Sequence, residues 1–327
     1  MELKDYSLKM KNAMQDYYGN GVTVVINQVT KNNGIILEGM TIQEKENNIS
    51  PTIYLNSFFE TYKNGATFSD NVKTIIQLYE QNKVSDRLNM DFFTKYEKVR
   101  GKIVYKLINY EQNQELLKVI PHIRYLDLAI VFYCLVTNEV IGDATILIHE
   151  KHRKMWKVSL ETLYEAAKEN TSKLLPFEIQ NMEEVMRKIL LDNLRKEYED
   201  TEMCKEEGRE NAEEWLNNMV EQMLLESMGE QIKIPMYVLS NQSRIHGAAC
   251  ILYKDVLKNF THEIGKDCYI LPSSIHETLL IPVDENRNTL ELNEMVQEVN
   301  QTQVDREEVL ANHAYYYSRV RDELRIL

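Results

Sequence analysis

The chain has 327 residues, of which 43% are hydrophobic and 27% are charged, which is typical of a soluble globular protein. Its formal net charge of −13 argues against direct binding to duplex nucleic acid, because phosphate backbones are held by clustered lysine and arginine. The four cysteines include no CxxC pair, so we expect free thiols in a cytoplasmic protein that binds no metal and no cofactor. The longest apolar run, residues 129–136, is too short to cross a bilayer, so we expect no membrane association.

The N-terminal part of the chain predicts a helix, a β-hairpin and further short helices. In residues 3–18, hydrophobic residues recur at helical spacing, at Leu3, Tyr6, Met10, Met14 and Tyr17. Two stretches rich in β-branched residues, 22–29 and 35–42, flank Asn33-Gly34, the pair preferred in type I′ turns. We place a boundary near residue 98, which separates an N-terminal subdomain of residues 1–98 from a main domain of residues 99–327.

The middle of the chain predicts a buried strand. Residues 123–136 are almost continuously apolar, as in the central strand of a sheet, and Asp127 is their one conspicuous charge. Residues 144–148 are expected to return as the partner strand, and residues 156–167 have helical periodicity.

Two longer helical patterns predict a helical hairpin at residues 180–229, inside the main domain. The acidic stretch between the two helices, residues 199–214, is expected to be a solvated connection. Methionines recur at helical spacing in the second helix, and we interpret them as core residues rather than as an adaptable binding surface.

Residues 234–283 predict a strand, a turn, a second strand, a helix and a pair of strands. After a helix near residues 290–299, Asp305 and Glu308 resemble a capping box for another short helix. The aromatic run at residues 314–317 is expected to be a strand or a docked tail. Together these patterns predict an α+β fold, in which an antiparallel or mixed sheet has helices packed on one face and an inserted helical hairpin.

Several segments resemble a known family. The runs MYVLSN, GAACILYKDVL and CYILPSSIHETLLIP, with LDLAIVFYC, LETLYEAAKENT and EEVLANHAYYYSR, are similar to an uncharacterised domain-of-unknown-function family found in gut Clostridia and their relatives. The order of hairpin, helix and strand pair also resembles the YtpQ-like bacterial proteins. The resemblance implies a cytosolic bacterial protein, and it brings no catalytic residues.

Ser274, His276 and Glu277 are the candidate catalytic residues, because serine, histidine and carboxylate are the types used in nucleophilic and acid–base catalysis. The segment lacks the GxSxG pattern of a nucleophile elbow. On a strand, Ser274 and His276 face one way and Glu277 the other, so an orienting carboxylate must come from elsewhere, with Asp127 as the candidate. The run Pro272-Ser273-Ser274 is also typical of a turn, and we expect His276 to support structure or binding.

Asn241, Arg244, His246 and Ser273 are the candidate binding residues. Residues 241–244 precede a small-residue run in the order of an anion cradle before a helix N-terminus, but they lack both glycine-rich phosphate-binding motifs. A hairpin turn packed on small residues explains the same pattern.

His149 and His152 form HExH, one residue short of the zincin motif, and no third ligand is evident. We therefore predict no metal site.

Three functions are compatible with the sequence. The first is a non-catalytic binding or regulatory protein, because no reaction motif accompanies a well-formed core. The second is a hydrolase-like enzyme that uses Ser274, His276 and Glu277. The third is an acidic protein that occupies a basic site on a nucleic-acid-handling partner, so a partner is expected to be a protein with a basic surface.

Overall fold

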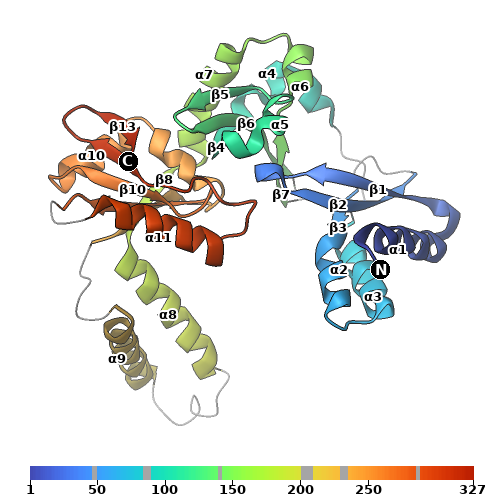
Figure 1. Cartoon of the computed structure of the whole chain (residues 1–327), viewed down its shortest axis with the longest axis horizontal. Helices are drawn as coiled ribbons and strands as arrows, with labels where there is room; N and C mark the ends of the chain where they lie inside the picture. Colours follow the sequence, from blue (N-terminus) through green and yellow to red (C-terminus); the bar gives the residue numbers. More distant parts are fainter. Residues whose placement is uncertain (46–49, 84–89, 139–141, 200–208, 229–234, 285–287) are drawn as a thin grey trace. The chain divides into compact units, whose positions relative to one another are not determined.

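The described strands pair antiparallel in three separate sheets. They are seen in a computed structural model that describes residues 1–45, 50–83, 90–138, 142–199, 209–228, 235–284 and 288–327 (Figure 1). The chain divides into two units, Met1–Asn170 and Thr171–Leu327. The α+β class is confirmed, although the strands are divided among three sheets.

The first sheet of the N-terminal unit is built on the predicted hairpin. Its strands are β1 (Val22–Thr30), β2 (Ile36–Glu44) and β3 (Thr52–Tyr54), and its helices are α1 (Leu3–Tyr18), α2 (Leu55–Lys63) and α3 (Phe68–Asn82). Asn33 and Gly34 both have left-handed φ values, of 57° and 68°, as a type I′ turn requires. The hairpin prediction is therefore confirmed, with Thr30 paired to Ile36.

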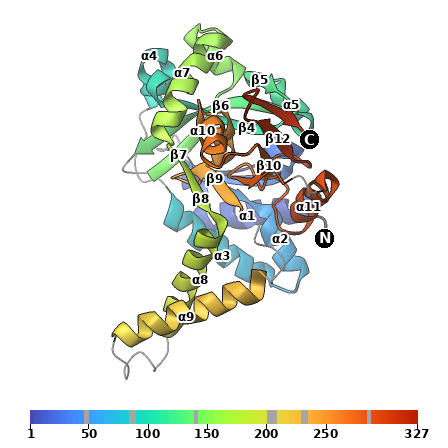
Figure 2. The same cartoon turned by 90° about the vertical axis from the view of Figure 1, so that its left-hand side faces the viewer.

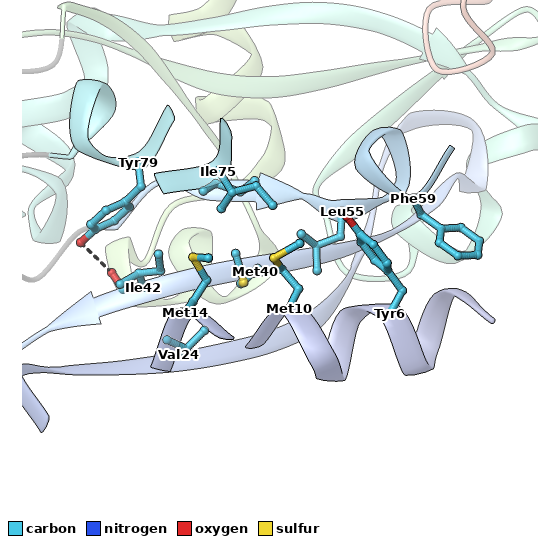
Figure 3. Packing of buried hydrophobic residues seen from close by; sticks show 11 residues of the cluster. Tyr6, Met10, Met14, Val24, Met40, Ile42, Leu55, Phe59, Ile75 and Tyr79 are labelled. Atoms are coloured by element: carbon cyan, nitrogen blue, oxygen red, sulfur yellow. Dashed lines mark hydrogen bonds between the residues drawn. The ribbon is translucent and has the colours of Figure 1, made fainter. Parts of the chain in front are cut away.

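The core of this part lies between α1, α2, α3 and the sheet (Figure 3). Tyr6, Met10 and Met14 are fully buried, as their i, i+4 spacing predicts. Tyr17 is 61% exposed, contrary to the prediction, because the following residue, Tyr18, turns toward the core and packs edge-on against Tyr79. The Tyr79 hydroxyl donates a hydrogen bond to the Ile42 carbonyl, which ties α3 to β2.

The second sheet of this unit has β6 at its centre. Its strands are β4 (Ile103–Asn109), β5 (His122–Tyr125), β6 (Leu128–Asn138) and β7 (Gly142–Leu147). The helices of this part are α4 (Tyr96–Val99), α5 (Gln114–Leu117), α6 (Glu150–Trp156) and α7 (Leu160–Leu174), the last of which crosses into the second unit.

The prediction of one strand at residues 123–136 is wrong, because this stretch forms a tight hairpin. Leu126, with a left-handed φ of 56°, and Asp127 connect β5 to β6. Asp127 therefore lies in a turn and not within the central strand, and its carbonyl accepts a hydrogen bond from the Tyr110 amide. An apolar run that is buried on both faces has the same sequence pattern whether it forms one strand or two. Only the pairing of β5 with β6 therefore shows that the chain turns.

The second unit contains the largest sheet, with strands in the order β13-β12-β10-β11-β9-β8. The strands are β8 (Phe177–Asn181), β9 (Tyr237–Asn241), β10 (Cys268–Pro272), β11 (Thr278–Pro282), β12 (Tyr315–Ser318) and β13 (Glu323–Ile326). The helices are α8 (Met182–Glu199), α9 (Arg209–Met228), α10 (Val256–Glu263) and α11 (Thr289–Thr302), with the 3₁₀ helix η7 (Gly247–Leu252).

The predicted helical hairpin is confirmed, and its insertion point is now defined. The helices α8 and α9 interrupt the chain between β8 and β9, which are neighbours in the sheet, with Asn181 paired to Tyr237. Figure 2 shows α8 continuing directly from the end of β8. The Met182 amide donates to the Met236 carbonyl at 2.8 Å and closes the base of the insertion. Residues 200–208 of the predicted acidic connection lie outside the described residues.

The end of the chain agrees only in part with the prediction. Tyr315–Ser318 form strand β12, as the aromatic run indicates. Asp305 and Glu308 do not cap a helix; the Glu308 amide donates to the Asp305 carbonyl at 2.7 Å and closes a turn. The boundary proposed near residue 98 stays a prediction. None of the described helices is long and apolar enough to cross a membrane.

Lys106 is an unusual residue for the middle of a buried strand. Every other residue of β4 is buried, and Lys106 itself is largely covered. Burial, together with the positive charge of Lys31, lowers the pKa of Lys106 to about 8. A buried lysine with a lowered pKa destabilises the fold at any pH at which it remains protonated.

We predict that Lys106→Met raises the free energy of unfolding by about 1–3 kcal/mol at pH 7. Below pH 8 the lysine is protonated in both the folded and the unfolded state, so the folded state bears the full free-energy cost of burying the charged ammonium group. Between pH 8 and 10.5 only the unfolded chain holds the proton, so the advantage of methionine should shrink as the pH rises. Chemical denaturation across this pH range, with the exposed Lys73→Met as control, measures the effect. A difference that does not vary with pH would contradict the argument.

Candidate functional site

Apart from Asp127, the predicted catalytic and binding residues lie on two neighbouring loops of the second unit or at the end of the strand that leads into one of them. Ser273, Ser274, His276 and Glu277 belong to the five-residue loop that connects β10 to β11, because Pro272 pairs with Thr278. They are therefore not on a strand, and side-chain alternation does not describe them. Arg244 and His246 belong to the loop between β9 and η7, and Asn241 is the last residue of β9.

Ser274 and His276 are close in space but do not form a nucleophile–base pair. The Ser274 hydroxyl oxygen accepts a hydrogen bond from the backbone amide of His276 at 2.9 Å, and the Ser274 amide donates to the Glu277 carbonyl at 3.2 Å. These are the contacts of a serine that stabilises a turn. Among the described residues, no hydrogen bond joins the Ser274 hydroxyl to an imidazole nitrogen, whereas a triad requires one.

The His276 ring connects its own loop to the neighbouring one. Its Nδ1 lies 3.1 Å from the His246 amide nitrogen and 3.2 Å from the Arg244 carbonyl oxygen. In the neutral ring with its proton on Nε2, Nδ1 accepts from the His246 amide. The rings of His246 and His276 are stacked, with centroids 5.4 Å apart and an interplanar angle of 17°.

The loop that receives this contact has an uncommon backbone. Arg244 and His246 both have a left-handed φ of 54°, which costs roughly 1–2 kcal/mol for each such residue. The Asn241 side chain holds the loop at both its polar ends: its Nδ2 donates to the Ile245 carbonyl at 2.8 Å, and its Oδ1 accepts from the Ile245 amide at 3.3 Å. The predicted binding residue Asn241 is thus buried and supports the loop.

Arg244 joins the loop to the edge strand β8 through half-exposed polar groups. Its guanidinium donates to Gln180 Oε1 at 2.5 Å, and it lies 3.5 Å from Glu178 Oε2 and 3.8 Å from Glu277 Oε2. Ser273 makes a long contact of 3.5 Å with Glu277. These polar side chains therefore contact one another, and such mutual contacts are typical of residues that stabilise the structure.

Glu308 is the carboxylate that lies against the His276 ring, and no sequence pattern links these two residues. Its Oε1 lies 3.5 Å from His276 Nε2, and its carbonyl accepts a hydrogen bond from the Ile275 amide at 2.8 Å. Asp127, the carboxylate expected at this place, lies in the β5–β6 turn of the other unit. The capping-box pattern of Asp305 and Glu308 was the only local signal at this position.

Gly247 is the point of closest contact between the two loops and β9. A Cβ atom at this residue would lie within 2.7 Å of Ser240 Oγ, the His276 carbonyl oxygen and the Asn241 amide nitrogen. The Ser240 hydroxyl donates to that same carbonyl at 2.8 Å. The small residues after His246 therefore serve close packing, and Gly247, Ala248 and Ala249 are buried in η7.

The second histidine pair, His149 and His152, caps a helix. His152 Nδ1 accepts a hydrogen bond from the His149 amide at 3.1 Å, at the start of α6. Burial, and then the nearby charge of Lys151, lowers the pKa of His149, and burial also lowers the pKa of His152. Within the described residues, no group of three or more histidine, cysteine, aspartate or glutamate side chains is arranged to hold a metal ion.

The cysteines of the described chain are buried free thiols, at Cys134, Cys250 and Cys268. Burial raises the pKa of Cys134 to about 11 and that of the other two to about 12. Such thiols are protonated near neutral pH and react slowly. Cys204 lies outside the described residues.

The inserted helical hairpin presents a different kind of surface. On α9, Leu216, Val220 and Leu224 are buried, whereas Trp215 is 47% and Met223 is 37% exposed, with Met219 between them half-buried. These last three residues follow one another at i, i+4 spacing and form the apolar stripe of α9. The interpretation of the methionines as core residues is therefore wrong for Met223, because the aliphatic residues on the adjacent side of the helix make the packing contacts.

The facing helix α8 is also incompletely covered. None of its side chains from Met182 to Lys196 is fully buried, although seven of these residues are aliphatic or methionine, and Ile189 is 55% exposed. Among the described residues, α8 and α9 pack mainly on each other, and a helix that packs mainly along one side leaves apolar surface uncovered on its other sides. The mixed pattern of exposure along α9 became visible only with the structure.

Comparison with known proteins places the chain among relatives of unknown function. Residues 3–319 match DUF5688, a family of unknown function. The chain belongs to this family. No curated protein and no solved structure shows significant similarity to it. Membership confirms the resemblance to a domain of unknown function, while the expected origin in gut Clostridia and the likeness to YtpQ-like proteins stay predictions.

We predict that Gly247→Ala lowers the free energy of unfolding by about 1–3 kcal/mol, because a methyl group overlaps three atoms of the adjoining backbone and Ser240. Gly101→Ala is the matched control, since a Cβ there meets no atom within 4 Å and the backbone φ is not left-handed. Urea denaturation of both variants measures the difference. Equal stability of the two variants would show that the loops move apart at little cost.

We predict that His276→Ala lowers the free energy of unfolding by about 1 kcal/mol, because the His246 amide loses its acceptor. His276→Asn should recover most of this loss, since its Oδ1 lies close to the place of Nδ1, and His276→Gln should recover less. Thermal denaturation of the three variants provides the comparison. If asparagine is no better than alanine, the bond to Nδ1 does not stabilise the loop.

Proposed function

We propose that this protein is a non-catalytic protein-binding module that uses the inserted hairpin of α8 and α9 as its contact surface. The observation that carries the proposal is the apolar stripe of α9, Trp215, Met219 and Met223, which stays partly exposed beside a fully buried packing face. Exposed apolar residues in a contiguous stripe are typical of interaction surfaces. Tryptophan and methionine are also enriched at such surfaces.

The composition of the stripe favours a protein partner over a small ligand. Covering a large apolar side chain fully contributes about 1.5–3 kcal/mol, so three partly exposed side chains supply several kcal/mol of binding free energy. Methionine side chains adapt to different partner shapes because they are unbranched and flexible. A convex helix surface of this kind suits another helix or a protein groove better than an enclosed small molecule.

The hydrolase alternative receives less support from the geometry. Within the described residues, no hydrogen bond joins the Ser274 hydroxyl to an imidazole, and His276 Nδ1 lies against the His246 amide. A serine nucleophile needs its proton directed to an imidazole nitrogen. The third hypothesis, an acidic protein at a basic site, is compatible with the binding proposal and with the net charge of −13. A cytoplasmic location belongs to the same proposal.

We predict that a photo-reactive amino acid at position 223 forms a covalent adduct with a partner protein in cells of the source organism. The same group at position 217, an exposed residue on the other flank of α9, should form none. The adduct at position 223 should disappear when Met219→Glu is also present, because a carboxylate in the stripe resists burial. Gel shift and mass spectrometry measure the adducts. No adduct at 223, or equal adducts at 217 and 223, would contradict the proposal.

A further inference from the structure

The apolar stripe of α9 lies in strongly acidic surroundings. From Glu210 to Met228 the helix contains five glutamates and no lysine or arginine. The whole insertion, residues 182–228, contains fourteen acidic and six basic residues. The element that exposes apolar side chains is thus also one on which the negative charge of the chain is concentrated.

The glutamates of α9 include two that pair with the facing helix. Glu213 and Glu221 form ion pairs with α8, at 2.8 Å to Arg195 and 2.7 Å to Arg187. Arg187 also holds the pKa of Glu221 below its ordinary value, through a hydrogen bond and the charge of the guanidinium. These two carboxylates are therefore already matched by positive charge within the hairpin.

Glu214 and Glu226 differ from that pair, and both are exposed. Glu226 accepts a hydrogen bond from the neutral amide of Gln222 at 3.1 Å, which leaves its negative charge in place. On a helix of 3.6 residues per turn, Glu226 projects from the same side as Trp215 and Met219, whereas Glu214 projects from the side of Glu221, away from the stripe. An apolar stripe with negative charge beside it is complementary to a helix that has one apolar and one basic face.

We infer that the stripe binds a basic amphipathic helix of a partner protein. This inference rests on the proposed function and specifies the partner class. A second copy of the chain is a poorer occupant, because each insertion has fourteen acidic and six basic residues, and like charges across an interface are repulsive. Lysine or arginine on the partner helix instead meets Glu226 while its apolar face covers Trp215, Met219 and Met223.

The test uses the full chain and three fluorescein-labelled helical peptides of about 18 residues, a length comparable to α9. All three have the same leucine face, and their polar face is lysine, glutamine or glutamate. Fluorescence anisotropy measures their affinities. We expect the lysine peptide to bind about tenfold or more tightly than the glutamine peptide, and its binding should weaken from about 50 mM to about 500 mM salt. The glutamate peptide should not bind.

Matched variants identify the residues that are responsible. Glu226→Gln should weaken binding of the lysine peptide and leave that of the glutamine peptide unchanged. Glu97→Gln with Glu115→Gln removes two exposed carboxylates from the other unit and should change neither. Met219→Gln with Met223→Gln should weaken binding of both peptides. If the control pair reduces binding as much as Glu226→Gln does, the attraction is to overall charge and the inference is overturned.

Two further outcomes separate this inference from the proposed function. Equal affinity for the lysine and glutamine peptides overturns the basic partner but leaves a binding surface in place. Self-association in sedimentation experiments that Met223→Gln abolishes would assign the stripe to a second copy of the chain and overturn the inference. Absence of binding by any peptide, together with absence of the adduct at position 223, would overturn both proposals.

Discussion

The pairing of β8 with β9 is the constraint on which the second unit depends. The chain must return from Asn181 to Tyr237, its partner in the sheet, after the whole insertion of α8 and α9. The hydrogen bond from the Met182 amide to the Met236 carbonyl keeps the two ends of the insertion together. The sheet therefore holds the base of the hairpin, while the helices rely on each other for packing. This arrangement explains how one helix has apolar side chains both in a buried packing face and in an exposed stripe beside it.

The same strand β9 leads into the loops that contain the catalytic residue types. At its end, Ser240 and Asn241 contact the β10–β11 loop and the β9–η7 loop, and Gly247 leaves no space between them. In these loops, serine and histidine accept hydrogen bonds from backbone amides, which need a partner when they are covered. Serine and histidine, which are catalytic residues in many enzymes, stabilise a turn here because their polar atoms form hydrogen bonds with the backbone.

Elements whose signal is local were predictable. The helix of residues 3–18 follows from the spacing of Tyr6, Met10 and Met14, and the first hairpin follows from Asn33-Gly34, because the left-handed backbone is a property of those two residues. The single strand expected across Asp127 was wrong, since apolarity reports burial and does not report chain reversal. The turn expected at Pro272-Ser273-Ser274 is present, but the placement of His276 on a strand was wrong. The partners of the His276 ring, His246 and Glu308, are distant in sequence.

Composition and local periodicity were sufficient for the α+β class, the acidic character, the lack of a reaction motif and the inserted hairpin, because each of these depends on residues that are close in the chain or on the chain as a whole. Composition and periodicity could not predict which face of each helix or strand is covered by other parts of the protein. Trp215, Met219 and Met223 have the same helical spacing as Leu216, Val220 and Leu224, and the location of α8 alone separates an exposed stripe from a packing face. Burial depends on neighbours brought together by folding, and a helical period specifies which residues share a face without specifying what lies against it.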